Sequence, residues 1–149
     1  MRAIIAQALK DALKAQDKLR ISTLRLVNAA IQDRDISNRG AGKDPVSDED
    51  ILQILAKMVK QREESAKAFD DGKRPELAEK ERAEIEVIRG FLPKQMEEAA
   101  VKQAVADAIA ETGAEGLRDM GRVMAVLKER FTGQMDFGKA GALVKASLQ

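Results

Sequence analysis

The stretch IEVIRGFLPKQ, residues 85–95, ends an apolar pattern of helical spacing with a proline. Proline fixes its own φ angle, lacks an amide hydrogen and disfavours helix at the residue before it. We therefore predict that a helix ends near Phe91-Leu92 and that Pro93 marks a domain boundary. A chain of 149 residues is long enough for two small helical domains. The predicted domains are residues 1–93 and 94–149.

The part of the chain before Pro93 predicts four helices, because apolar residues recur three and four positions apart. Their apolar positions are Ile5, Leu9, Ala12 and Leu13 in the first helix, Leu24, Val27 and Ile31 in the second, Ile51, Leu55, Met58 and Phe69 in the third, and Leu77, Ile85, Ile88 and Leu92 in the fourth. Asp17 or Ser22 is expected to help start the second helix. The segment ISNRGAGKDPVSDED, residues 36–50, interrupts the pattern, and within it Ser47 and Asp50 approximate a capping box that opens the third helix.

The part of the chain after Pro93 predicts three shorter helices. The first ends at Thr112-Gly113, the second runs from about Arg118 to Phe131, and the third reaches the C-terminus. Their apolar positions are Met96, Val101, Val105 and Ile109, then Met120, Val123, Met124, Leu127 and Phe131, and last Phe137, Leu143, Val144 and Leu148. No segment alternates with the period of a strand. The expected fold is all-α, a four-helix bundle-like N-terminal domain followed by a three-helix C-terminal domain.

The absence of histidine and cysteine excludes much catalytic chemistry. Nucleophilic triads usually take histidine as their base, and zinc and iron sites draw mainly on histidine and cysteine. No P-loop motif is present. We expect no metal and no cofactor. No apolar run is long enough to span a bilayer, so we expect no membrane contact. Without cysteine the chain forms no disulfide, and a cytoplasmic location is the simplest interpretation.

Charged residues of the third and fourth predicted helices are expected to face solvent, among them Lys60, Arg62, Glu63 and Glu64. Glu81 and Glu84 lie three residues apart and, with Glu63 or Glu64, define a carboxylate cluster in principle. Di-iron bundles, however, use Glu-x-x-His pairs, and the chain has no histidine. A solvated charged face is the favoured interpretation.

The formal net charge of +1 conceals a gradient along the chain. Residues 1–43 carry an excess of basic residues, residues 44–93 carry an excess of acids, and residues 94–149 are balanced. One interpretation is that the basic segment packs beside the acidic one. The other is an electropositive surface for nucleic acid, although a pI near 7.9 is lower than is typical of autonomous nucleic-acid-binding domains.

Three segments, in order, resemble the YqeY family. They are Lys60-Gln61-Arg62-Glu63-Glu64-Ser65, Glu81-x-x-Glu84-Ile85 running into Phe91-Leu92-Pro93-x-Gln95, and Asp119-Met120-Gly121-Arg122-Val123-Met124. The resemblance covers essentially the whole chain. It departs at Met96-Glu97, which lacks the N-capping hydroxyl of the family's usual Leu-Ser, and at Phe137, where the family commonly has glycine after the aspartate.

The YqeY family resembles, in its C-terminal domain, the tail of GatB, a subunit of the tRNA-dependent amidotransferase. This resemblance implies a two-domain helical fold and a link to tRNA, because the GatB tail contacts tRNA during amidation of glutamyl- or aspartyl-tRNA. The family label is carbon–nitrogen ligase activity with glutamine as amido-N-donor. We do not expect that activity from this chain alone, since the kinase and transamidation chemistry belongs to a large separate domain.

Candidate tRNA contacts follow from that resemblance. Arg118 and Arg122 are one helical turn apart and can form a phosphate clamp, or they pair locally with Glu115 and Asp119. Accessory phosphate contacts are expected from Lys94, Lys128 and Lys145.

The other motif positions predict structural roles. Gln61, Arg62 and Ser65 are expected at a contact between the domains, and Met120 and Met124 in the core. Gly121 is expected to allow close approach of helices. The remaining motif positions are Glu81, Glu84, Pro93 and Gln95.

Two main hypotheses about function stay open. The first is a non-catalytic protein associated with tRNA or aminoacyl-tRNA. The alternative is a helical protein-interaction module that docks on an amidotransferase or another translation component without binding RNA. A third and weaker hypothesis is an independent enzyme with Glu81 and Glu84 as acid and base. No DNA partner is expected.

Overall fold

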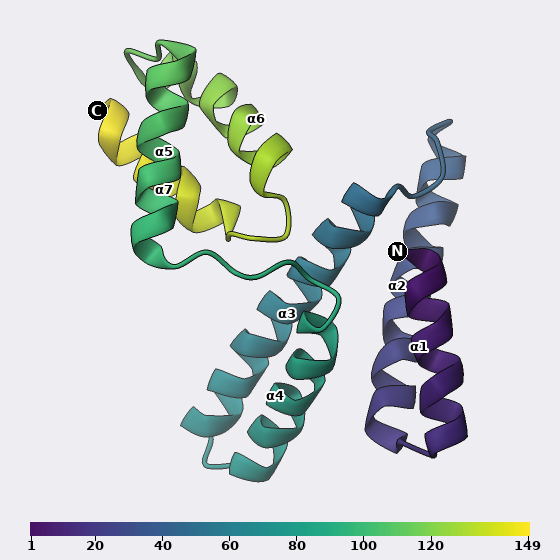
Figure 1. Ribbon diagram of the computed structural model, residues 1–149. Coiled ribbons are helices and arrows are strands. Elements are labelled where there is room, and N and C mark those ends of the chain that lie inside the picture. The colour runs from purple at the N-terminus through teal and green to yellow at the C-terminus, as the bar shows by residue number, and fades with distance from the viewer. The chain divides into compact units, whose positions relative to one another are not determined.

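The computed structural model describes residues 1–149 and contains seven α-helices, one 3₁₀ turn and no strand. The helices are α1 (Arg2–Ala15), α2 (Lys18–Gly40), α3 (Asp48–Asp71), α4 (Pro75–Arg89), α5 (Glu98–Thr112), α6 (Met120–Phe131) and α7 (Phe137–Leu148), with the 3₁₀ turn η1 at Leu117–Asp119 (Figure 1). The all-α prediction is therefore confirmed. The chain divides into two compact units, Met1–Leu92 and Pro93–Gln149.

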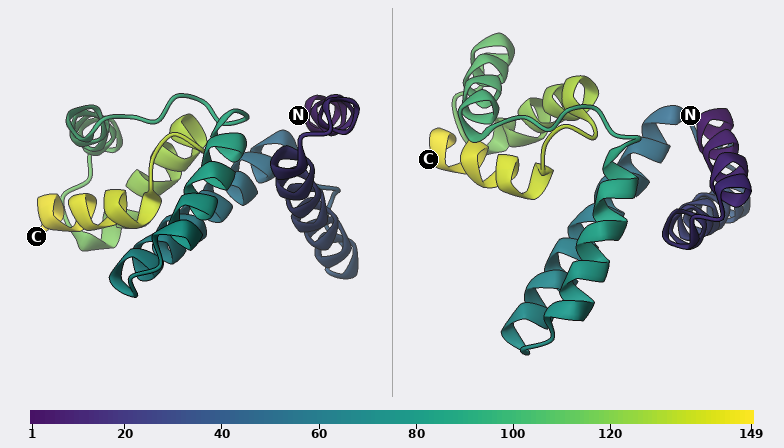
Figure 2. Two further views of the ribbon diagram at one scale, coloured as in Figure 1. Left: turned by 90° about the horizontal axis from the view of Figure 1, so that it is seen from below. Right: turned by 60° about the horizontal axis from the view of Figure 1, so that its bottom comes forward.

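The first unit is built from two antiparallel helix pairs, α1 with α2 and α3 with α4. The α3 and α4 helices lie side by side in every view (Figure 2). Gln16 closes α1 with a left-handed φ of 56°, which lets the chain reverse direction. The next residue, Asp17, caps α2 by accepting a hydrogen bond from the Arg20 amide at 3.1 Å. Of the two predicted starts of α2, Asp17 is the cap, because the Ser22 hydroxyl bonds to the Leu19 carbonyl instead.

The boundary between α2 and α3 differs from the prediction at one end. The α2 helix continues through the start of the segment 36–50 and ends at Gly40, so the predicted interruption at residue 36 is wrong. The turn chemistry lies further on, because Gly42 is the residue with positive φ and the Asn38 side chain donates to the Asp44 carbonyl at 3.1 Å. The capping box of α3 is confirmed, with Ser47 and Asp50 each accepting from the other's amide.

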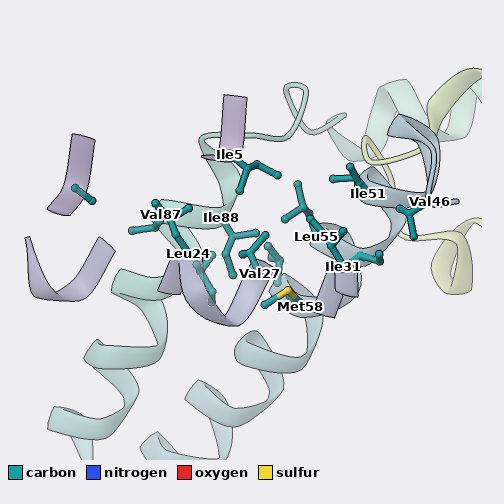
Figure 3. Close-up of a cluster of buried hydrophobic side chains, with 14 residues drawn as sticks. Ile5, Leu24, Val27, Ile31, Val46, Ile51, Leu55, Met58, Val87 and Ile88 are labelled. Carbon is teal, nitrogen blue, oxygen red and sulfur yellow. The ribbon is translucent and has the colours of Figure 1, made fainter. Parts of the chain in front are cut away.

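Fourteen buried apolar residues form the core of the first unit (Figure 3). They are Ile5, Ala12, Leu24, Val27, Ile31, Val46, Ile51, Ile54, Leu55, Met58, Val59, Ile85, Val87 and Ile88. They come from all four helices and from the segment before α3. Burial of branched aliphatic side chains therefore holds the two helix pairs together.

Asp35 fixes the segment that leads into α3. Its carboxylate accepts hydrogen bonds from Arg2 at 2.7 Å and from the Val46 amide at 2.9 Å. The Arg2 guanidinium and then the Val46 amide lower the pKa of Asp35. This one carboxylate connects α1, α2 and the buried Val46.

The second unit has a core of its own. Each of α5, α6 and α7 packs against the other two. The buried residues are Ala104, Val105, Ala108, Val123, Leu127, Met135, Ala140, Val144 and Leu148. Met120 and Met124 pack against this cluster, as predicted. The α6 helix begins at Met120, slightly after the start near Arg118 that the sequence predicted, because Arg118 lies in the preceding 3₁₀ turn.

The helix starts of the second unit differ in their caps. Asp136 accepts a hydrogen bond from the Gly138 amide at 2.8 Å and caps α7. Glu97 stands at the N-cap of α5 and makes no capping hydrogen bond. The loss of a capping hydroxyl expected at Met96-Glu97 is therefore confirmed.

Candidate nucleic-acid interface

The predicted basic contacts lie on different elements of the second unit. Arg118 is on η1, Lys128 on α6, Lys145 on α7 and Lys94 in the segment before α5. All four side chains are exposed, and none of them makes a hydrogen bond or an ion pair within the chain. Their charges are therefore available to a ligand without breaking an intramolecular contact.

Arg122 differs from these four because it has local partners. Its Nη2 donates to Asp119 Oδ1 at 2.6 Å, and its Nη1 to the Thr112 carbonyl at 3.4 Å. Asp119 in turn accepts from the Glu115 amide at 3.0 Å. The Glu115 amide and then Arg122 lower the pKa of Asp119. Of the two interpretations of the arginine pair, local pairing therefore holds for Arg122 and not for Arg118.

The exposed face of α6 combines basic and very small residues. Gly121, Arg122, Ala125 and Lys128 are all exposed, and their spacing of three or four residues places neighbours on one side of the helix. A Cβ added to Gly121 would meet no atom within 4 Å. The prediction that Gly121 allows close approach of another helix is therefore wrong.

The glycine at a helix crossing is Gly141 of α7. A Cβ there would lie 3.5 Å from Met120 Cε and 3.9 Å from Met124 Cε. Gly141 is buried, whereas Gly121 is exposed in the first turn of α6. Nothing in the fold therefore requires glycine at position 121.

The balanced charge of the second unit is unevenly distributed among its helices. The α5 helix carries three acids and one lysine, α6 carries three basic residues and one acid, and α7 carries two lysines and no acid. Arg130 of α6 pairs with Glu111 of α5 at 2.5 Å, which lowers the pKa of Glu111 and raises that of Arg130. Positive charge is thus concentrated on α6 and α7.

Lys139 of α7 is a basic residue that was not among the predicted contacts. It is exposed, lies in the first turn of α7 and is one of its two lysines. The absence of any acid between Phe137 and Leu148 was the signal in the sequence that pointed to it.

Gln95 has a structural role in the second unit. Its Nε2 donates to the Gly133 carbonyl at 2.5 Å and to the Pro93 carbonyl at 3.4 Å. The Met96 amide donates to the Gln134 carbonyl at 2.9 Å. The Pro-x-Gln motif therefore attaches the start of this unit to the loop between α6 and α7.

The motif residues of the first unit are brought together across α3 and α4. Arg62 Nε lies 3.0 Å from Glu84 Oε2, and Arg62 Nη1 donates to the Met58 carbonyl at 3.3 Å. Glu84 is buried, so the prediction that Arg62 and Glu84 face solvent is wrong. A buried carboxylate on α4 needs a cationic partner, and α3 supplies it.

The other motif residues of this unit stay nearer the surface. Gln61 is exposed, while Ser65 and Glu81 are half-buried. No three carboxylates gather closely enough to hold a metal ion. With Glu84 held by Arg62, the structure offers no pair of free carboxylates at positions 81 and 84. The expected contact of Gln61, Arg62 and Ser65 with the second domain stays a prediction.

The fold and these contacts define an all-helical protein of two units, with unpaired basic side chains on the second. None of its helices has the length and apolar content needed to cross a membrane. A family model described as "Yqey-like protein" matches residues 2–148. The chain therefore belongs to the YqeY-like family, as the three sequence motifs predicted.

Several fungal proteins are similar to the chain. An uncharacterized protein of Schizosaccharomyces pombe is 33% identical over 94 residues, which cover 63% of this chain and 73% of that protein. Proteins named "altered inheritance of mitochondria protein 41, mitochondrial" match at 28% identity in Pyrenophora tritici-repentis and 37% in Kluyveromyces lactis. The matches cover 82% and 60% of this chain, and 68% and 46% of those proteins.

Proposed function

We propose that this chain is a non-catalytic accessory protein that binds tRNA or aminoacyl-tRNA through its second unit. The similarity of the family's C-terminal domain to the GatB tail supports tRNA as the ligand. The proposed site rests on one observation, the exposed face formed by η1 and α6. There Arg118 and Lys128, neither of them ion-paired, stand on either side of the open position Gly121 along the chain.

This face has the chemistry that an RNA backbone requires. A guanidinium binds phosphate through two parallel hydrogen bonds, and a lysine acts as a point charge. A glycine without surrounding atoms lets a sugar–phosphate chain approach the helix closely. Arg118 is the stronger candidate of the two arginines, because Arg122 already shares its charge with Asp119.

Binding is expected to depend on salt. The second unit carries no net charge, so affinity has to come from the few basic residues of α6, α7 and η1. Three phosphate contacts to single-stranded RNA give a slope of about −2 for log affinity against log salt. Direct phosphate contact therefore predicts a moderate affinity that falls clearly between low and physiological salt.

The test is fluorescence anisotropy of dye-labelled total tRNA titrated with the full chain at two salt concentrations. An unrelated structured RNA serves as the ligand control. The double variant Arg118→Glu/Lys128→Glu is expected to bind about tenfold more weakly. The control Lys10→Glu/Lys102→Glu, which makes the same charge change elsewhere, is expected to keep its affinity.

Two results contradict the proposal. One is absence of tRNA binding at low salt, and the other is equal weak binding to any RNA. Either result favours the alternative, a helical module that docks on an amidotransferase or another translation component. Equal losses of tRNA affinity in the two double variants contradict the proposed site but not tRNA as the ligand.

A cytoplasmic site of action belongs to the same proposal. The names of the fungal relatives place those proteins in mitochondria. Both compartments contain tRNA, so a tRNA ligand is compatible with either one. Fluorescence microscopy of the tagged full-length protein in its own cells checks the location.

A further inference from the structure

A groove of about 360 Å³ opens between α2 and α3 in the first unit. Ala30 of α2 and Ile54 and Met58 of α3 supply its apolar part. Ile54 and Met58 each keep 8% of their surface exposed, so they belong to the core and also border the groove. The groove therefore has an apolar floor that continues into the hydrophobic core.

Basic side chains line both helices of the groove. Arg34 lines it on α2 and Lys57 on α3. Both are exposed, and neither makes an ion pair or a side-chain hydrogen bond within the chain. Asp33 is the one acid among the lining residues. The charge along the groove is therefore positive on balance, with a cation on each helix.

The groove also holds polar side chains without intramolecular partners. Gln61, the motif residue of α3 that stays exposed, lines it together with Gln53 and Ser37. None of the three side chains makes a hydrogen bond within the chain. They provide donors and acceptors above the apolar floor, which is the usual arrangement of a recognition groove.

Apolar surface continues along α2 beyond the groove. Leu26 is 47% exposed, and it stands four residues before Ala30, on the same side of the helix. An apolar stripe from Leu26 to Ala30 and then to Ile54 and Met58 of α3 suits one partner element lying along α2. A methionine in the floor can adapt its side chain to that element.

We propose that this groove binds an amphipathic helix of a partner protein, one whose apolar stripe is flanked by acidic residues. The apolar floor takes the apolar stripe, and the cations Arg34 and Lys57 pair with the acids on its two sides. This is the helix-in-groove mode of recognition, with charge complementarity selecting the partner. The site lies in the first unit and does not depend on tRNA binding by the second.

Other occupants fit the groove less well. Single-stranded RNA is recognised by stacking of its bases on aromatic side chains, and no aromatic residue lines the groove. A second copy of the chain would have to supply a helix with a free apolar stripe and acidic flanks. The two helices richest in acids, α3 and α4, already bury their apolar residues in the core of the first unit.

The test uses a synthetic helical peptide of about 18 residues with leucine at one face and glutamate on both sides of it. The comparison peptide has lysine in place of every glutamate. Each peptide carries a dye, and its anisotropy is followed during titration with the full chain. The acidic peptide is expected to bind with saturation below about 100 µM, and the basic one to bind at least about tenfold more weakly.

Charge reversal at the groove separates specific docking from general attraction. In Arg34→Glu/Lys57→Glu the acidic peptide is expected to lose about tenfold in affinity, and the basic peptide to gain. The matched control is Arg25→Glu/Lys67→Glu, which reverses exposed cations on the same two helices outside the groove. The control is expected to retain its preference for the acidic peptide. Ser37→Trp adds the chain's only tryptophan, whose emission should shift when the acidic peptide binds.

Four results would overturn the proposal. The first is failure of the acidic peptide to saturate the chain at about 1 mM. The second is an equal loss of affinity in the two double variants. The third is binding of labelled tRNA that depends on Arg34 and Lys57, which would assign the groove to RNA. The fourth is a dimer in sedimentation that Arg34→Glu/Lys57→Glu dissociates, which would assign the groove to a second copy of the chain.

Discussion

Arg62 of α3 and Glu84 of α4 form an ion pair beneath the surface of the first unit, with Nε and Oε2 3.0 Å apart. The two side chains are only 14% and 10% exposed. Arg89 and Glu63 join the same two helices at 2.5 Å, but those side chains are 42% and 51% exposed. The same pair of helices therefore contains a buried ion pair and an exposed one that serves as its control.

Removal of Glu84 is expected to destabilise the first unit strongly. Glu84→Ala leaves the Arg62 charge buried without its partner, which costs about 3 kcal/mol. Glu63→Ala at the exposed pair is expected to cost less than about 1 kcal/mol. Urea denaturation followed by far-UV circular dichroism measures both. Similar losses of stability in the two variants would show that burial does not make the Arg62–Glu84 pair more important for stability.

A serine at the N-cap of α5 is expected to stabilise the second unit. Glu97 makes no capping hydrogen bond there, so amides of the first turn of α5 lack a side-chain acceptor. Glu97→Ser supplies a hydroxyl acceptor and is expected to add about 1 kcal/mol. Glu97→Ala is the control, since alanine cannot cap. Thermal unfolding should rank serine above both glutamate and alanine, and equal midpoints for serine and alanine would contradict the prediction.

Gly121→Ala separates the structural from the ligand-binding explanation of that glycine. The added methyl meets no atom and the position is helical, so the change is expected to stabilise α6 by about 0.5 kcal/mol. If RNA approaches this face, tRNA affinity should fall at the same time. Hydrogen exchange of α6 amides and tRNA anisotropy measure the two effects. Unchanged tRNA affinity would exclude close approach of RNA at Gly121.

Thr23 of α2 presents a buried hydroxyl that has no hydrogen-bond partner. Burial of an unpaired hydroxyl is unfavourable, and valine has nearly the same shape without it. Thr23→Val is therefore expected to stabilise the first unit by about 1 kcal/mol. A loss of stability in urea denaturation would indicate that the hydroxyl is solvated in the folded protein.

Stability is expected to change little between about pH 5 and 9, because the chain has no histidine or cysteine. Folding lowers the pKa of Asp35, Glu111 and Asp119. The unfolded chain therefore takes up protons first as the pH falls. The stability that these carboxylates contribute is complete above their ordinary pKa, and it is lost below about pH 4.

Urea midpoints measured across this pH range test whether these carboxylates account for the loss of stability in acid. Asp35→Asn should reduce the acid sensitivity of the first unit, because it removes the carboxylate that Arg2 and Val46 hold. A steep change between pH 6 and 8 would contradict the prediction, since no side chain of the chain ordinarily titrates there.

Local sequence patterns were enough to predict the helices, their principal caps and the family. Apolar residues three and four apart specify helix locally, and Ser47 with Asp50 forms its capping box between near neighbours in the chain. Pro93 and Gln95 could be recognised as motif residues, although the bond from Gln95 to Gly133 crosses 38 positions.

Which charges are buried, paired or free depends on how the helices pack, and the sequence did not predict it. Arg62 and Glu84 lie on separate helices, and sequence periodicity does not report what faces a side chain from another helix. For the same reason the roles expected of Gly121 and of the paired arginines changed, since Gly121 is open and Arg122 has partners. The groove between α2 and α3 depends on how the two helices pack, which is a property of the whole unit and not of either segment.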